Sequence, residues 1–452
     1  MSKPSIPQGT RDFSSEVLRK RNYIFSTIKN VFECYGFQPL ETPAMENLET
    51  LMGKYGEEGD RLIFKILNNG LSDPKNIEKA KEGFQKIIDG KNSALLTERA
   101  LKYDLTIPFA RYVAMNHGQL TFPYKRYQIQ PVWRADRPQK GRYREFTQCD
   151  ADVVGSKALI NEVELSNIYH DVFTKLGLMG YKLKINNRKI LVGLAEQISG
   201  PSLLTAITVA IDKLDKIGLD KVNLELQQKG LTDTQIKLIN QYVNIAGANQ
   251  EKLSQIENLL GQHPLVVEGV NELRYIIDHA SDVNIDVDFT LARGLNYYTG
   301  SIFEVKAPEN VQMGSIGGGG RYDNLTGLFG VPDIPGVGIS FGVDRIYDVM
   351  EELNLFPNDI QVGVRALFFN MGEKESAFAY KTMKGLRSAG ISCEMFHESA
   401  KMDKQFKYAE KKNIAHVVII GSTEIEEKNC IVKNIQTGVQ QKVSIDELKE
   451  IL

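Results

Sequence analysis

Two stretches far apart in this sequence combine arginine with glycine and aromatic residues. The first is Arg134-Ala135-Asp136-Arg137-Pro138-Gln139-Lys140-Gly141-Arg142-Tyr143-Arg144-Glu145-Phe146. The second is Ala292-Arg293-Gly294-Leu295-Asn296-Tyr297-Tyr298-Thr299-Gly300. Arginine binds phosphate through two parallel hydrogen bonds and also stacks on rings. The two stretches together therefore indicate two halves of one site for an anionic substrate.

Alternation of side chains extends the first stretch into a predicted β-hairpin. Successive side chains of a strand point to opposite faces, so six of these residues would share one face. They are Arg142, Arg144, Phe146, Gln148, Asp150 and Asp152. On the preceding strand, Arg126, Gln128, Gln130 and Arg134 would share a face, with Tyr127, Ile129 and Trp133 on the other. A polar, arginine-rich face favours a triphosphate ligand, although an antiparallel sheet with one solvated side explains the same pattern.

Four arginines are expected at strand ends or at strand-to-helix turns, with no nucleophile beside them. They are Arg134, Arg142, Arg293 and Arg345. This arrangement is typical of transfer chemistry that depends on positioning and charge stabilisation, as at a phosphoryl centre. Taken singly, each arginine is more simply explained as a solvated surface residue.

Other classes of site find no support in the sequence. The run Gly317-Gly318-Gly319-Gly320 is not followed by the Lys-Ser/Thr of a phosphate-binding loop, and it better fits a strand that a backbone or ligand approaches closely. Neither GxSxG nor HExxH occurs, so covalent catalysis is not indicated. The 6 histidines and 4 cysteines lack ligand-like spacing, so we expect no metal site built from side chains.

Composition limits the remaining possibilities. A chain of 452 residues can form two to four domains, and its net charge of −2 gives no overall attraction to a polyanion. The first residues carry no apolar stretch of signal-peptide length, and no apolar run is long enough to cross a bilayer. We expect a soluble, cytoplasmic protein with no membrane partner.

The pattern of elements divides the chain into segments. A helix is expected from Ser14 to Cys34, strands over Leu62–Leu67 and Ala94–Thr97, and a helix capped by Thr106. From 189 to 280 the pattern is helical nearly throughout, which indicates an insertion. A boundary follows at Phe356-Pro357-Asn358-Asp359, and the remainder alternates strand and helix as in a small, mostly parallel α/β domain.

Several of these stretches resemble the motifs of one family. The segment from Arg134 to Phe146 resembles motif 2 of the class II aminoacyl-tRNA synthetases, in its histidyl form, and Arg293-Gly294-Leu295-Asn296-Tyr297-Tyr298 resembles a peptide peculiar to histidyl-tRNA synthetases. Weaker resemblances are to motif 1, in Tyr35-Gly36-Phe37 through Pro43, to motif 3, in 336–345, and to the usual start of the family, in Pro7-Gln8-Gly9-Thr10-Arg11-Asp12-Phe13. The motifs follow one another in the order of the family.

The resemblance implies a fold and a division into domains. The fold would be an α+β catalytic core on a mostly antiparallel sheet, with a helical insertion and a C-terminal α/β domain. The catalytic core would occupy 1–187 and 281–355, the insertion 188–280, and an anticodon-binding domain 361–452. The family resemblance also implies a homodimer formed through the motif 1 region.

An activity and a set of site residues follow from the same resemblance. ATP, with Mg²⁺ bound through its phosphates, would activate L-histidine to histidyl-adenylate, and the histidine would pass to tRNA(His). Arg293 and Arg134 would be catalytic. Histidine would contact Asp104, Thr106, Arg134, Gln148, Asp152, Arg293, Tyr297, Tyr298 and Tyr322. ATP would contact Arg134, Arg142, Phe146, Gln148 and Arg345, and the acceptor end of the tRNA would contact Arg137, Gln139 and Lys140.

Two other functions remain open at this point. Some synthetase-like chains are non-catalytic regulatory subunits of histidine biosynthesis, but these typically lack the arginine peptide and the C-terminal domain that this chain has. A nucleotide-binding regulatory module without tRNA activity has the same spacing of motifs. Histidine-dependent exchange between ATP and pyrophosphate, with and without tRNA, distinguishes these functions.

Overall fold

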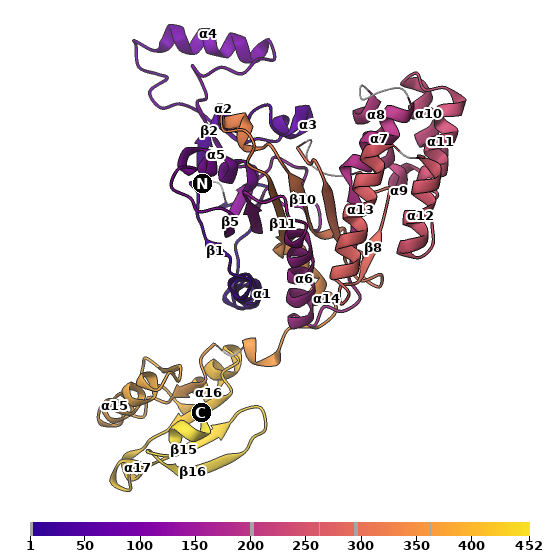
Figure 1. Ribbon diagram of the computed structural model, residues 1–452. Helices are drawn as coiled ribbons and strands as arrows, with labels where there is room; N and C mark the ends of the chain where they lie inside the picture. Colours follow the sequence, from indigo (N-terminus) through magenta and orange to yellow (C-terminus); the bar gives the residue numbers. More distant parts are fainter. Residues whose placement is uncertain (1–2, 199–202, 262, 293–296, 362) are drawn as a thin grey trace. The chain divides into compact units, whose positions relative to one another are not determined.

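The chain forms two compact units, Met1–Phe356 and Pro357–Leu452, in a computed structural model (Figure 1). The structure describes residues 3–198, 203–261, 263–292, 297–361 and 363–452. Within these ranges, no helix combines the length and the apolar character that a membrane span requires.

An eight-stranded sheet organises the first unit. Its strands, in the order β1-β5-β6-β11-β10-β9-β7-β8, are Gln38–Pro39, Tyr124–Trp133, Glu145–Val154, Gly336–Gly342, Ser315–Tyr322, Ser301–Lys306, Lys182–Asn187 and Ile285–Val287. The inner strands pair antiparallel, whereas β1 and β8 at the two edges pair parallel to β5 and β7. The sheet is therefore mixed. The expected mostly antiparallel character describes its interior but not its edges.

Helices cover one face of this sheet. They include α1 (Ser15–Cys34), α6 (Ile160–Lys175) and α14 (Val343–Glu352). The Ser14 side chain caps α1 by accepting a hydrogen bond from the Val17 amide at 3.4 Å, and Gly36, at φ +81°, lies just beyond its end. Phe32 of α1 packs against Tyr127 of β5 and Phe341 of β11. The apolar face of the hairpin β5–β6 is thus buried under helices, and its polar face is left for the opposite side.

A smaller sheet and short helices lie between β1 and β5 in the sequence. The sheet, in the order β2-β4-β3, consists of Met45–Asn47, Arg99–Leu101 and Lys65–Ile66, and the helices α2 to α5 are Leu48–Leu51, Gly56–Arg61, Ile77–Ile88 and Thr106–Asn116. Two expectations were wrong here. The strand expected over Ala94–Thr97 starts later, at Arg99, and α5 is capped by the Asp104 side chain, which accepts from the Ile107 amide at 3.2 Å, rather than by Thr106.

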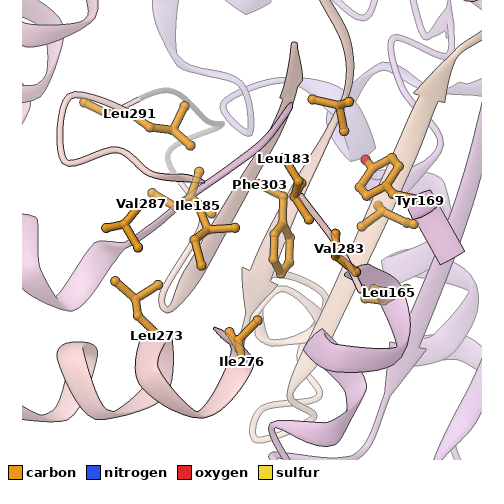
Figure 2. Close-up of a cluster of buried hydrophobic side chains, with 14 of the residues drawn as sticks. Leu165, Tyr169, Leu183, Ile185, Leu273, Ile276, Val283, Val287, Leu291 and Phe303 are labelled. Atoms are coloured by element: carbon orange, nitrogen blue, oxygen red, sulfur yellow. The ribbon is translucent and has the colours of Figure 1, made fainter. Parts of the chain in front are cut away.

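A group of helices lies at the β8 edge of the sheet (Figure 1). These helices, α7 to α13, are Arg188–Ile198, Leu204–Asp212, Leu214–Ile217, Leu219–Gln228, Asp233–Val243, Asn249–Leu259 and Pro264–His279. Their apolar side chains belong to the same core as the sheet: Leu273 and Ile276 of α13 lie near Ile185 of β7 and Phe303 of β9 (Figure 2). This continuous packing fixes the helices to the sheet that carries the site.

The second unit is built on its own five-stranded sheet. The strands, in the order β13-β12-β14-β15-β16, are Cys393–Met395, Ala366–Phe368, His416–Ile419, Asn429–Asn434 and Gln440–Ser444. The helices are α15 (Glu373–Ser388), α16 (Met402–Lys411), α17 (Ser422–Glu426) and α18 (Leu448–Ile451). The pairings at β12 are parallel and those at β15 are antiparallel, so the expected mostly parallel sheet is mixed. The added hairpin β15–β16 accounts for the difference.

Candidate functional site

The hairpin β5–β6 presents its polar face away from the helices. Its register places Arg126 opposite Asp152, Gln128 opposite Asp150 and Gln130 opposite Gln148. The Arg126 guanidinium pairs with the Asp152 carboxylate at 2.8 Å, and both side chains are almost fully buried. The solvated-face explanation is therefore wrong for this part of the hairpin, because these two charged side chains are buried. A buried charge is stable only when it is paired, whereas a charge on a solvated face needs no partner.

A small cavity of about 70 Å³ opens on this polar face. It is lined by Asp104, Thr106, Arg134, Gln148, Asp150, Asp152, Tyr297, Tyr298, Gly318, Gly319, Tyr322, Gly338, Ile339 and Ser340. Every described residue that the family resemblance assigns to histidine is in this set. The residues come from α5, β6, β10 and β11 and from segments outside these elements, and only the folding of the sheet brings them together.

Asp104, which lines the small cavity, has hydrogen-bond partners at only one of its two carboxylate oxygens. Its Oδ1 accepts from the Tyr55 hydroxyl at 2.8 Å and from the Ile107 amide, while its buried Oδ2 has no hydrogen-bond partner. The Oε1 of Gln148 is also buried without a partner. Two unsatisfied acceptors in one cavity are suited to a ligand that brings N–H donors, such as an ammonium group.

Asp152, which also lines the small cavity, is contacted by two other side chains. The Tyr322 hydroxyl donates to its Oδ1 at 2.6 Å, and Arg126 pairs with its Oδ2. Burial raises the pKa of Asp152, while the Arg126 charge and the Tyr322 hydrogen bond oppose that rise. Gly338 makes this placement possible, since a Cβ there would lie 2.0 Å from Asp152 Oδ1.

Three tyrosines close the small cavity. The ring of Tyr297 lies edge-on to those of Tyr298 and Tyr322, at centroid distances of 5.1 and 6.2 Å. Gly320 leaves room for Tyr298, because a Cβ at position 320 would lie 2.9 Å from that ring. The glycine run in β10 therefore allows a neighbouring side chain to approach the strand closely, as the sequence indicated.

A larger cavity of about 400 Å³ adjoins the small one. Phe146, Arg142 and Arg345 line it, together with glycines of β10. Arg345 is held by two carbonyls, since its Nε donates to Gly141 O at 2.8 Å and its Nη1 to Ser315 O at 2.6 Å. The fixed guanidinium and the nearby aromatic ring suit a flat, electron-rich ligand such as a nucleobase.

The expected strand face does not extend to Arg142 and Arg144. Strand β6 begins at Glu145, so both arginines precede it. Arg142 still lines the larger cavity, and its Nη1 lies 3.6 Å from Asp136 Oδ1. Arg144 turns away: its Nε donates to Asp136 O and its Nη1 to Gln8 O. The tight bridge between Gln139 and Arg142 breaks the extended alternation that the sequence indicated.

Arg134 belongs to both cavities. It follows β5 directly, its Nε donates to Tyr103 O at 3.0 Å, and its guanidinium lies 4.3 Å from the Tyr103 ring centroid and 5.2 Å from that of Phe146. Gln148 and Tyr298 also line both cavities. A positive group fixed at the junction of two ligand cavities can hold the reacting ends of two substrates together.

Other predicted residues lie away from the cavities or beyond what the structure describes. Arg137, Gln139 and Lys140 are exposed and line neither cavity, and Lys140 pairs with Glu352 at 3.2 Å. Arg293, with the next three residues of its peptide, lies outside the described residues. In the described part of the chain, no group of three or more His, Cys, Asp or Glu side chains could hold a metal ion.

Sequence reasoning did not assign several residues that complete the site. The alternation of side chains predicted that Arg126 and Asp150 lie on the polar face of the hairpin, but it assigned no role to either residue. Tyr55, which fixes Asp104, and Lys102, whose Nζ donates to Gln130 Oε1 at 2.6 Å, had no local signal because their partners are distant in the sequence.

The buried carboxyl group of Asp150 makes the folding stability of the chain depend on pH. Burial, partly offset by Arg126, raises its pKa to about 7 from an ordinary value of 3.8. The folded chain thus binds this proton more tightly than the unfolded chain does. The associated stability is present below about pH 4 and is lost as the pH rises through about 7.

We expect the free energy of unfolding to fall by about 1 kcal/mol more between pH 6 and 8 in the unaltered chain than in Asp150→Asn. Urea unfolding at both pH values measures this, and an equal fall in the two proteins would contradict it.

Comparison with known proteins agrees with the motifs. A family model described as histidyl-tRNA synthetase matches residues 75–346, and one described as anticodon binding domain matches residues 362–452. The chain is 51% identical to the histidine–tRNA ligase of Flavobacterium johnsoniae, over 100% of this chain and 99% of the relative. It is 53% identical to that of Bacteroides fragilis strain YCH46, over 99% and 98%. The crystal structure of histidyl-tRNA synthetase from Nostoc sp. PCC 7120 superposes with a TM-score of 0.82 at 31% identity and covers 100% of both chains.

These matches cover both units and include the strands and loops that line the two cavities. The family model spans more than half of the chain, and the relatives match it over nearly their whole length. The chain therefore belongs to the histidyl-tRNA synthetase family.

Proposed function

We propose that this chain activates L-histidine with ATP to form histidyl-adenylate and then transfers the histidine to the 3′ end of tRNA(His). The observation that carries the proposal is the meeting of two cavities at Arg134. The smaller has carboxylates and hydroxyls suited to an amino acid, and the larger has the ring and guanidinium groups suited to a nucleotide. The full-length similarity to histidine–tRNA ligases supports the same activity.

In the first step, a carboxylate oxygen of histidine attacks the α-phosphorus of ATP and pyrophosphate leaves. Arg134 would hold that carboxylate and the α-phosphate at the junction of the cavities, which brings the reacting atoms together and offsets their charge. Arg142 would contact the outer phosphates, with the adenine between Phe146 and Arg345. Arg293 would stabilise the charge that develops during the attack. Magnesium would be carried by the phosphates of ATP. In the second step, a ribose hydroxyl of the tRNA attacks the histidyl carbonyl and AMP leaves.

Selection of histidine is a matter of matching hydrogen bonds. Asp104, Thr106 and Gln148 would hold the ammonium group, because Asp104 and Gln148 each present an unsatisfied acceptor. Asp152, with Tyr322 and Tyr298, would meet the imidazole nitrogens. The Oδ2 of Asp152 forms an ion pair with Arg126 but is buried without a hydrogen bond, so a ligand side chain without a matching N–H would leave this acceptor unsatisfied and be rejected.

The remaining parts of the chain would serve tRNA binding and assembly. Residues 361–452 would form the anticodon-binding domain, in which Lys404, Lys407 and Lys411 are exposed at helical spacing on α16 and can contact a phosphate backbone. Residues 188–280 would be an insertion between two parts of the core, 1–187 and 281–355. A cytoplasmic homodimer formed through the motif 1 region completes the proposal.

Aminoacylation with transcribed tRNAs tests the proposed function. The purified chain should attach labelled histidine to tRNA(His) in the presence of ATP and Mg²⁺, and should leave a tRNA for another amino acid uncharged. Failure to charge tRNA(His), with ATP and histidine still bound, would favour the nucleotide-binding regulatory module or the non-catalytic regulatory subunit instead.

The exposed loop next to the larger cavity should act on tRNA only. Arg137, Gln139 and Lys140 project from it without lining either cavity, so they can reach the acceptor end, and backbone contacts of this kind position a nucleic acid. We expect Gln139→Ala combined with Lys140→Ala to reduce kcat/KM for tRNA about tenfold and to weaken its salt dependence, while pyrophosphate exchange stays unchanged. Parallel assays of the two reactions check this. Equal losses in both would place the loop in the ATP site.

A further inference from the structure

A segment near the N-terminus contacts residues that line the larger cavity. We call Pro7–Phe13 the N-terminal strap. Its backbone is tied to the loop between β5 and β6, because the Arg144 amide donates to Gly9 O at 2.9 Å and the Arg144 side chain donates to Gln8 O at 3.3 Å. The Arg144 carbonyl in turn accepts from the Arg134 amide at 3.0 Å. The backbone of Arg144 therefore connects the strap to Arg134, the arginine that lines both cavities.

Arg11 connects the strap to two walls of the cavity. Its Nη2 pairs with Asp344 Oδ1 at 2.5 Å, and its guanidinium lies 3.3 Å from the centroid of the Tyr143 ring. Both Asp344 and Tyr143 line the larger cavity, whereas Arg11 lines neither cavity.

Asp344 is the point where four segments meet. Besides Arg11 of the strap, it pairs with Arg21 of α1 at 2.5 Å, and its Oδ2 accepts from the Thr147 amide of β6 at 3.4 Å. The residues proposed to hold adenine are next to this contact in the sequence, since Thr147 follows Phe146 and Asp344 precedes Arg345. A shift of Asp344 therefore changes the spacing between those two groups.

We infer that Arg11 is a positioning residue for ATP: by bridging Asp344 and Tyr143, it fixes the separation of the walls that hold the nucleotide. This inference rests on the proposed function of the larger cavity. It predicts a larger effect on ATP than on histidine, because Arg11 contacts Asp344 and Tyr143, which line the larger cavity and not the smaller one.

Gly9 provides an independent way to disturb the same contact. It adopts φ +86°, and a Cβ there would lie 2.8 Å from Arg144 Cγ and 2.9 Å from Pro138 Cγ. Alanine at this position would push the strap away from the loop. Gly90 is a matched control, since it has φ +77° and a Cβ there would have no neighbouring atom within 4 Å, so Gly90→Ala adds a similar backbone strain without a clash.

The test measures KM for ATP and for histidine separately in pyrophosphate exchange, with thermal midpoints recorded for each variant. Arg11→Ala should raise KM for ATP about tenfold, as expected for loss of a charge-assisted contact, and leave KM for histidine within about twofold. Arg11→Lys should recover part of the effect, because the charge remains but the flat stacking group is lost. Gly9→Ala should act in the same direction. Arg274→Ala, which removes an arginine–glutamate pair at 3.2 Å in the helical insertion, and Gly90→Ala should change neither KM.

Two outcomes would overturn the inference: an unchanged KM for ATP in both Arg11→Ala and Gly9→Ala, or equal increases for ATP and histidine. Failure of the proposed function is recognised separately, because the unaltered chain would then show no exchange. In that case calorimetric titration with ATP alone still decides the role of Arg11, with about tenfold weaker binding expected in Arg11→Ala.

Discussion

Replacing Arg134 by alanine should lower kcat/KM for histidine-dependent pyrophosphate exchange by about 100- to 1000-fold, as for loss of a preorganised charge at a reacting centre. Arg134 lines both cavities, and its orientation is set by Tyr103 O and by the rings of Tyr103 and Phe146. The loss should fall mainly on kcat, because the groups that bind the imidazole and the adenine remain in place.

Arg134→Lys separates charge from geometry. Lysine keeps the positive charge but cannot form the planar fork, so we expect an intermediate rate. The thermal midpoints of both variants should stay close to that of the unaltered chain, since Arg134 is only partly buried. Near-normal exchange in Arg134→Ala would remove this residue from the mechanism.

Deleting the second compact unit should separate the two steps of the reaction. The chain divides at Pro357, and both cavities lie in the first unit. A protein ending before Gln361 should therefore retain pyrophosphate exchange. Aminoacylation at limiting tRNA should fall about 100-fold or more, because a second tethered contact with the same ligand raises affinity by that order.

A charge-altered full-length chain controls for the deletion. Lys404→Glu combined with Lys407→Glu and Lys411→Glu keeps the unit but reverses the charge of one face of α16. It should weaken aminoacylation and leave exchange intact. If the truncated protein charges tRNA(His) as well as the full chain does, the second unit has another role.

Local patterns were sufficient for parts of the fold. The sequence pattern predicted a helix from Ser14 to Cys34, which matches α1 to within one residue, and side-chain alternation predicted which face of β6 carries Gln148, Asp150 and Asp152. Edge strands were not predictable in the same way. Strands β1 and β8 have only two and three residues, and their parallel pairing depends on where the chain returns to the sheet.

The site shows the same limit. The described residues that the family resemblance assigns to histidine line the small cavity. The partners that hold them come from register and from distant loops: Arg126 meets Asp152 because the hairpin pairs them, and Tyr55 meets Asp104 from the start of another helix. Arg142 and Arg144 were misplaced because a tight bridge in the loop interrupts the strand, and no alternation rule detects such a bridge.

The most direct test of the account is amino-acid-dependent exchange of pyrophosphate into ATP by the unaltered chain without tRNA. The two adjoining cavities predict that L-histidine supports exchange and that amino acids without a side-chain N–H, including leucine and methionine, support less than about one part in 10,000 of that rate, since the buried acceptor would be left without its partner. Exchange that is absent with histidine, or equal with other amino acids, would contradict the account.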